Sequence, residues 1–214
     1  YTGPPSFGKA GHFGPERWFG YVSGENPGYP EQAIADTMAC MHGRLEQIEN
    51  DDWAHVDEWD VHHWQNLNPV VPEGLVQMAM GTPAAIYHGG LMHASVRYFD
   101  PERRRPGLPE HVAALVERVH PEGIRLTLVN TDVLQAHEVV VQAGAFGEHR
   151  FVRARDVDRE GVSPGEGIGR YLLVRLGPGA RLCADLDMRR FVNDPSYALP
   201  SWEQLRECRS EERK

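Results

Sequence analysis

The sequence predicts an α+β fold, in which an irregular, helical N-terminal part precedes a small antiparallel β-sandwich. Before residue 81, apolar side chains recur at steps of three and four, which is the spacing of one helix face. After residue 124 they alternate with polar side chains, and turn residues rather than helices separate these runs, which favours antiparallel strands. We expect four parts: an aromatic arm rich in Gly and Pro over 1–29, a helical part over 30–121, a β domain over 122–202 and a charged tail over 203–214.

The first part combines aromatic rings with residues that interrupt helices. Residues 1–29 are rich in Gly and Pro, so we expect no regular helix there. Unstructured segments are usually poor in aromatics, so we expect an ordered arm over a surface of this chain or of a partner. The alternative is a simple trimmed end. Because the chain starts at Tyr1 without a methionine, we also expect missing leader residues or cleavage from a larger polypeptide.

The most regular helix is expected over 30–50. Pro30 suits the first helical position, and Glu31 in the first turn complements the positive end of the helix dipole. An apolar stripe follows and is expected to pack in the core. Its members are Ile34, Met38, Met41, Leu45 and Ile48.

Two further helices are expected before the β domain. The first covers 72–80 and ends at Gly81, with Leu75, Val76, Ala79 and Met80 as its buried side. The second covers 109–120, where Val112, Leu115, Val116 and Val119 form an apolar stripe.

Strands are expected where the period of the sequence changes to two. A short strand over 95–99 precedes the third helix. Alternating runs of β-branched and aliphatic residues then follow, separated by turn residues such as those at 130–132 and 177–179. These runs are 124–130, 138–142, 149–154, 171–176 and 181–186. An extended tail over 191–202 is expected to pack through Phe191, Tyr197, Leu199 and Trp202.

Composition limits the classes of function. The 214 residues carry a formal net charge of −9, which argues against nucleic acid and against anionic membranes as partners. Cys40, Cys183 and Cys208 form no CxxC pair, so we expect reduced thiols in a cytoplasmic protein. No apolar run approaches the roughly 18 residues of a membrane span, and no secretory signal is recognised.

The C-terminal half resembles the β domain that follows the catalytic barrel in many carbohydrate-active enzymes. The resemblance rests on the strand 124–130 that ends in Asn130, the returning strand 138–144 and the late hairpin 174–182. The N-terminal half is similar to the closing helices of a helical-barrel, glycoside-hydrolase-like enzyme. Three helices cannot close a barrel, so the resemblance implies that a missing N-terminal catalytic portion or another chain supplies the others.

The segment 55–66 is the leading candidate site, because three histidines, three carboxylates and two tryptophans suit a pocket wall. Glu58 and His62 share a face if the segment is helical, whereas Glu58, Asp60 and His62 share one if it is extended. Either arrangement pairs a carboxylate with an imidazole for general acid–base chemistry, and a purely structural or surface role is the alternative. The candidate catalytic residues are Glu58, Asp60, His62 and His63.

Other residues are candidates for contact with a substrate. Trp59 and Trp64 can stack on a ligand or simply pack, and Asn66 can bind a ligand or form a turn. Tyr87 and His88 adjoin the glycine pair at 89–90, where backbone can approach a ligand or act as a hinge. A third candidate segment is 144–149, in which Glu148 and His149 are expected to form an exposed pair.

Two hypotheses of function follow, and a third stays open. The first is a fragment or subunit of an enzyme that acts on a carbohydrate or similar polar small molecule by carboxylate acid–base chemistry. The second is a non-catalytic accessory or interaction subunit of a larger oligomeric assembly. We expect no cofactor. We assign no metal ligand, because the HExxH zinc signature is absent. A metalloenzyme using His62, His63, His88 or His93 remains a further alternative.

Overall fold

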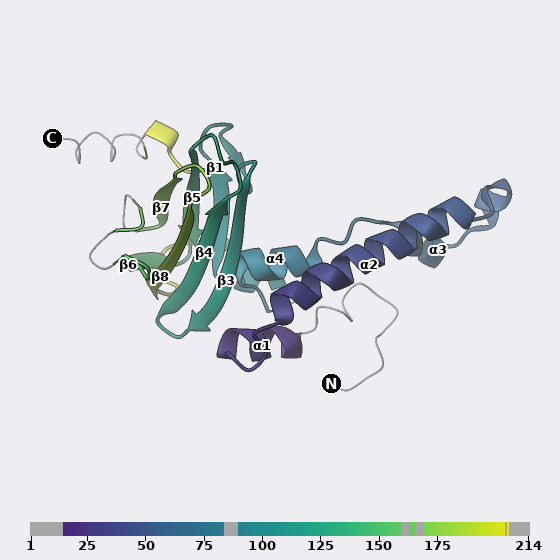
Figure 1. Ribbon diagram of the computed structural model, residues 1–214, viewed down its shortest axis with the longest axis horizontal. Helices are drawn as coiled ribbons and strands as arrows, with labels where there is room; N and C mark the ends of the chain where they lie inside the picture. The colour runs from purple at the N-terminus through teal and green to yellow at the C-terminus, as the bar shows by residue number, and fades with distance from the viewer. Residues whose placement is uncertain (1–14, 84–89, 160–162, 166–168, 204, 206–214) are drawn as a thin grey trace.

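The computed structural model describes residues 15–83, 90–159, 163–165, 169–203 and 205. Two four-stranded antiparallel sheets form a β-sandwich, and helices precede it, so the α+β class is confirmed. Figure 1 shows the sandwich at one end of the molecule and a long helical projection at the other. No helix in the described part of the chain is both long and apolar enough to cross a membrane.

The two sheets take strands from both sides of residue 122, where the β domain was expected to begin. One sheet has the order β2-β1-β5-β7 and the other β3-β4-β8-β6. The strands are β1 (Val96–Asp100), β2 (Arg105–Pro106), β3 (Val112–His120), β4 (Gly123–Asn130), β5 (His137–Ala143), β6 (Arg150–Asp156), β7 (Tyr171–Leu176) and β8 (Arg181–Arg189).

Alternation along each strand creates the core between the sheets. In β5, for example, Val139 and Val141 point into the core, whereas Val140 lies in a separate cluster with Phe99 and Leu173 on the outer face of the sheet. This pattern confirms the strands expected near 95–99, 124–130, 138–142, 149–154, 171–176 and 181–186.

The helix expected over 109–120 is wrong, because Val112–His120 forms β3. Val112 and Val116 lie four residues apart, and this spacing fits one face of a strand as well as one face of a helix. A register shift in the pairing with β4 falls between Val116 and Arg118, so the alternation is interrupted within the strand. The β-branched valines fit a strand better than a helix.

A regular helix also occurs where none was expected. Helix α1 (Pro15–Ser23) lies within the segment that was taken to be too rich in Gly and Pro. Pro15 stands at the first helical position, where its missing N–H costs no hydrogen bond. Gly24, with a φ of +90°, follows the last residue of the helix. The helix buries Trp18, Tyr21 and Val22.

Helices α2 (Tyr29–Asn50) and α4 (Glu73–Met80) confirm the two expected helices, but their buried sides differ from the expectation. α2 buries Tyr29, Ala33 and Thr37, whereas its apolar stripe is only partly buried, at Met41 and Ile48, and is exposed at Ile34, Met38 and Leu45. α4 buries Glu73, Gly74, Gln77 and Met78, while Leu75 is 53% exposed and Val76, Ala79 and Met80 are partly buried. The stripes were assigned to the core from periodicity alone, which does not show which face of a helix meets its neighbours.

The helices meet the sandwich at β3. Both α1 and α4 contact this strand. α4 ends at Gly81, whose φ of +62° is the left-handed conformation that suits glycine at a helix C-terminus. The Tyr29 hydroxyl donates a hydrogen bond to the Gln77 side chain, so the start of α2 is fixed to α4. The rest of α2 extends away from the sandwich.

The segment after β8 runs from 191 to 202 without a strand, as expected. Phe191 is 77% exposed and Tyr197 80% exposed, but their rings pack edge-on against His149 and Phe146, at 4.7 Å and 5.0 Å between centroids. Leu199 is also exposed. Trp202 is partly buried and packs on the outer face of β1, β5 and β7. Residues 1–14 of the aromatic arm expected over 1–29, and all but two residues of the charged tail expected over 203–214, lie outside the described residues.

Candidate functional site

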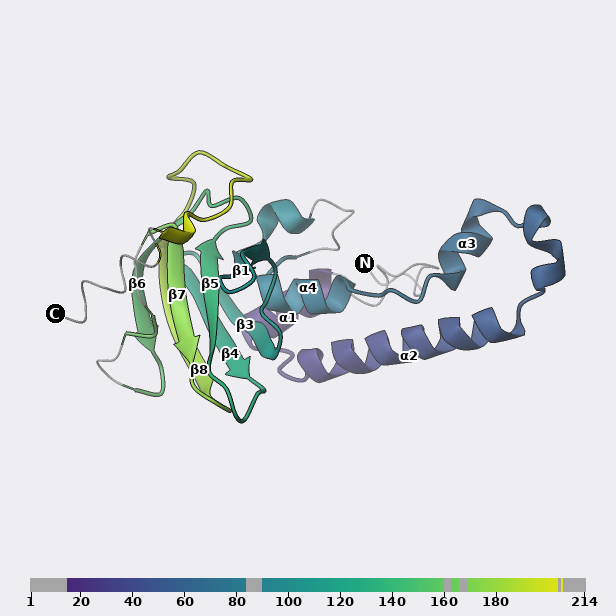
Figure 2. The same cartoon turned by 90° about the horizontal axis from the view of Figure 1, so that it is seen from above.

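The segment 55–66 lies at the end of a projecting helical arm. We define the acidic arm as α2, the 3₁₀ helix η2 (Trp53–Glu58) and α3 (Val61–Leu67). Figure 2 shows α3 alongside the far part of α2, with both directed away from the sandwich. The Arg44 guanidinium fixes the end of α3 against α2, because it donates hydrogen bonds to the backbone oxygens of Gln65 (3.1 Å) and Asn68 (2.5 Å).

The four candidate catalytic residues face solvent or support the local backbone. The side chains of Glu58 and His62 are 74% and 80% exposed. The Asp60 carboxylate caps α3 by accepting a hydrogen bond from the His63 N–H at 2.9 Å. This backbone bond lowers the pKa of Asp60. None of these residues lines the polar cavity or the apolar cavity that lie on the sandwich.

His63 and Trp59 belong to an aromatic cluster that closes the tip of the arm. The Trp59 ring lies 5.1 Å from Trp53, 4.9 Å from Trp64 and 4.2 Å from His63, measured between centroids. His63 Nε2 lies 2.7 Å from a carboxylate oxygen of Asp51. The tip therefore brings together residues predicted for catalysis and for substrate contact, but in a packed cluster rather than around a cavity.

An apolar row is exposed along the acidic arm. Ile34, Met38 and Leu45 are 50%, 47% and 44% exposed, and their spacing places them on one face of α2. Residues 29–67 hold nine Asp and Glu but only one Arg and no Lys, so the arm accounts for nearly all of the formal charge of −9. The combination is an apolar face on a strongly negative projection.

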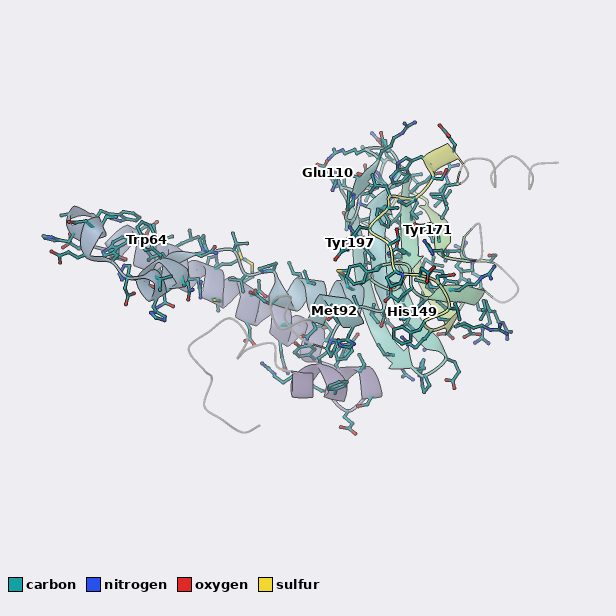
Figure 3. The ribbon with its side chains drawn as sticks, turned by 180° about the vertical axis from the view of Figure 1, so that it is seen from behind. Trp64, Met92, Glu110, His149, Tyr171 and Tyr197 are labelled. Atoms are coloured by element: carbon teal, nitrogen blue, oxygen red, sulfur yellow. The ribbon has the colours of Figure 1, made fainter. Side chains whose placement is uncertain are left out.

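The remaining predicted substrate contacts are either exposed or not described. Asn66 is exposed on α3, and Trp64 is 47% exposed at the tip. Figure 3 shows Trp64 at the far end of the arm, remote from Glu110 and Tyr171 on the sandwich. Tyr87 and His88 lie outside the described residues. His93, in the short helix η4 (Gly90–His93), is exposed.

Glu148 and His149 are buried, so the expectation of an exposed pair is wrong. Glu148 accepts a hydrogen bond from the Phe146 N–H, and His149 Nδ1 accepts one from the Phe191 N–H at 3.1 Å. The Glu148 carboxylate therefore closes the β5–β6 turn itself. The His149 side chain and the Glu148 backbone oxygen, which accepts from the Val192 and Asn193 N–H groups, hold the segment after β8 against that turn. Because burial disfavours the imidazolium, the pKa of His149 is lowered.

The lowered pKa of His149 predicts a loss of stability in mild acid. The unfolded chain binds this proton more readily than the folded one, so the contribution of the neutral imidazole is complete above about pH 6.5 and is lost as the pH falls below that value. We expect urea unfolding between pH 7.5 and pH 5 to show this loss. It should be reduced in His149→Gln, which has no imidazole to protonate. If the parent chain and His149→Gln lost stability equally as the pH fell, protonation of His149 would not be the cause of the loss.

A polar cavity of about 900 Å³ lies on the sandwich. It is formed by the β1–β2 turn, the segment before β3, the β4–β5 loop and the outer face of β7. Its residues include His111, Asp132 and His137, which sequence reasoning missed as site residues. The only sequence signal was a run of turn residues at 130–132. This run predicted a loop, but it did not predict which other loops would lie beside it.

A second cavity, of about 430 Å³, is apolar and lies between α4 and the β2-β1-β5-β7 sheet. Its walls include Leu75, Met80, Leu108, Phe146 and Tyr197. Figure 3 places Tyr197 beside the sandwich, in the segment after β8. Among the residues that the structure describes, no three His, Cys, Asp or Glu side chains are grouped to hold a metal ion.

Fold and site together define a β-sandwich protein with an acidic helical arm. Residues 7–76 match a family model described as a domain of unknown function, DUF8034. The match covers well under half of the chain and includes α1 and the whole acidic arm, but none of the strands. No curated protein and no solved structure gives a significant match.

Proposed function

We propose that this chain is a non-catalytic interaction subunit whose acidic arm binds an apolar, basic surface of a different protein. The observation that carries the proposal is the exposed row of Ile34, Met38 and Leu45 on a helix that projects from the sandwich. An amphipathic helix normally turns such a row towards its own core. Here α2 instead buries Tyr29, Ala33 and Thr37, and Met41 of the same stripe packs partly against the adjoining buried cluster.

The exposed row has the properties of a docking face. Contiguous apolar side chains on a surface mark a site of association more often than single exposed residues do. The tip adds Trp53 and Trp64, which are 51% and 47% exposed. Tryptophan is enriched among residues that dominate binding energy in protein interfaces. The arm thus offers aliphatic contact along α2 and aromatic contact at its end.

Charge identifies the kind of partner. A second copy of the chain would bring two arms with nine acidic residues and one Arg each into contact, and like charges oppose that association. A groove lined with apolar residues and bordered by Lys and Arg would pair with both features of the arm. We therefore commit to a basic partner rather than to a homodimer.

Catalysis on a carbohydrate by Glu58 and Asp60 stays a prediction of the sequence. In such a mechanism one carboxyl group protonates the leaving oxygen and the other activates water or attacks the sugar. The exposed positions of both groups mean that a partner would have to supply the enclosing walls. A metal site using His62, His63, His88 or His93 likewise remains a prediction.

The test uses a synthetic amphipathic helical peptide with a leucine face flanked by lysines. A matched peptide with glutamates in place of the lysines has the same apolar face and the opposite charge. We expect the basic peptide to bind, more weakly at higher salt, and the acidic peptide to bind at least about tenfold less tightly by fluorescence anisotropy.

Variants locate the binding face. Ile34→Ser combined with Met38→Ser and Leu45→Ser should weaken binding of the basic peptide at least about tenfold. Val133→Ser combined with Leu134→Ser removes apolar side chains that are 74% and 83% exposed on the sandwich, and it should leave binding unchanged. Equal affinity for both peptides, or no effect of the triple substitution, would contradict the proposal. If the chain formed a concentration-dependent dimer that the triple substitution abolished, the partner of the arm would be a second copy of the chain rather than a basic protein.

A further inference from the structure

The cavity on the sandwich is a built, polar concavity on the outer face of the β2-β1-β5-β7 sheet. We call it the sheet cavity. Its volume of about 900 Å³ is within the range of small-molecule sites. The outward-facing side chains of β5 and β7 form part of it, and loops at one end of the sandwich enclose the rest. No residue of the acidic arm takes part.

One wall is a carboxylate held in a fixed position. Asp132 accepts hydrogen bonds from the backbone N–H groups of Leu134 (2.8 Å) and Gln135 (3.1 Å). The other oxygen of Asp132 lies 3.2 Å from His137 Nε2. These bonds lower the pKa of Asp132, the Leu134 N–H contributing most. The His111 ring lies 5.7 Å from the His137 ring and extends the same wall.

A second part of the cavity wall is also preorganised. The buried Asp100 carboxylate accepts from the N–H groups of Glu102 (3.1 Å) and Arg103 (3.0 Å) and lies 3.4 Å from Arg105 Nη2. Arg103 in turn forms a 2.6 Å ion pair with Glu110. Backbone N–H groups therefore fix two carboxylates of the cavity, those of Asp132 and Asp100.

Four of the five carboxylates that line the sheet cavity have a basic side chain beside or opposite them, and Glu102 is the fifth. Asp132 lies beside His137, Asp100 beside Arg105, and Glu110 beside Arg103. Glu138 and Arg175 occupy directly opposed positions on β5 and β7 and both line the cavity. A free anion would meet several carboxylates, and a free cation would have to compete with the guanidinium groups already present. A neutral ligand rich in hydrogen-bonding groups meets neither obstacle.

An apolar surface completes the cavity. Leu173 and Leu205 line it together with the Trp202 indole, whose position is set by contact with Phe99 at 6.4 Å between ring centroids. An indole beside hydrogen-bonding side chains suits a ligand that carries both C–H faces and hydroxyl groups. We infer that the sheet cavity binds a neutral polyhydroxylated ligand, namely a mono- or oligosaccharide.

The experiment titrates the whole chain with cellohexaose, xylohexaose, mannohexaose and maltohexaose by calorimetry. Spermidine and inorganic phosphate serve as the cationic and anionic comparisons. We expect at least one of the four saccharides to bind with a Kd below about 1 mM, and spermidine and phosphate to bind more weakly. Failure of all four saccharides to bind, or tighter binding of spermidine or phosphate, would overturn the inference.

Three variants assign the binding to the sheet cavity. Trp202→Ala and Gln135→Ala should each weaken saccharide binding, Trp202→Ala by about tenfold or more. Gln135 is exposed, so its variant keeps the test valid if Trp202→Ala loosens the C-terminal segment. Arg150→Ala, an exposed position on β6 in the other sheet, should bind as the parent does. Unchanged binding in both cavity variants would overturn the inference. The arm proposal fails separately, because its peptides and its substitutions involve no residue of the cavity.

Discussion

Replacing Trp59 with alanine is expected to open the tip of the acidic arm while leaving the sandwich intact. The Trp59 ring contacts those of Trp53, Trp64 and His63, so its removal leaves three rings without their shared neighbour. Deleting a large, partly buried aromatic side chain of this kind costs about 2 kcal/mol. The loss should be local, because the tip makes its contacts within the arm.

Hydrogen exchange measures this local loss directly. In Trp59→Ala, amides of 51–67 should exchange about 30-fold faster, which corresponds to 2 kcal/mol of local opening. Amides of β4, β5 and β8 should be unaffected. Val61→Ala is the matched control, because Val61 is 61% exposed. Unchanged exchange over 51–67 in Trp59→Ala would show that the aromatic cluster does not hold the tip together.

Replacing Gly123 with alanine is expected to destabilise the sandwich itself. A Cβ at this position would lie 2.1 Å from the backbone oxygen of Leu186 and 3.0 Å from the Asp187 Cα. Backbone of the paired strand β8 cannot move aside as a flexible side chain could, so pairing between β4 and β8 must shift. Overpacking at such a position costs on the order of 3 kcal/mol.

In chemical denaturation, Gly123→Ala should have a lower free energy of unfolding than the parent chain and an unchanged m-value. Gly177→Ala provides the control, since the nearest atom to its Cβ would be the Ala180 Cβ at 4.0 Å. If Gly123→Ala unfolded at the same urea concentration as the control, the close approach of β4 to β8 described here would be contradicted.

The strands of the sandwich were the most predictable part of the fold. Runs such as 138–142 and 171–176 alternate over their whole length and are bounded by turn residues, so local pattern and final structure agree. The strand at Val112–His120 was missed because its apolar spacing also fits a helix and because its pairing register shifts after Val116. Pairing with β4 makes this segment a strand, and that pairing is a tertiary contact that the local sequence pattern does not show.

The candidate sites were less predictable for a related reason. The sequence indicated 55–66 as a candidate site, but a concentration of ionisable and aromatic residues does not show whether they surround a cavity or cover a projection. In α2, helical periodicity placed Ile34 and Met38 on one face, and only the packing of the neighbouring helices left that face exposed. The sheet cavity was missed because Asp100, His111, Asp132 and Trp202 are distant in sequence and meet only in the folded sandwich.

Oxidation of methionines tests whether the acidic arm is a docking surface, because one methionine lies on its exposed row. Met38 is 47% exposed, whereas Met78 and Met188 are each 5% exposed. With limiting peroxide, Met38 should oxidise much faster than Met78 and Met188 in the isolated chain, and the basic amphipathic peptide should protect it. The exposed Met92, at 66%, is the internal control that should stay reactive with the peptide present. If Met38 were as slow as Met78 in the isolated chain, or equally fast with and without the bound peptide, the acidic arm would not be the docking surface.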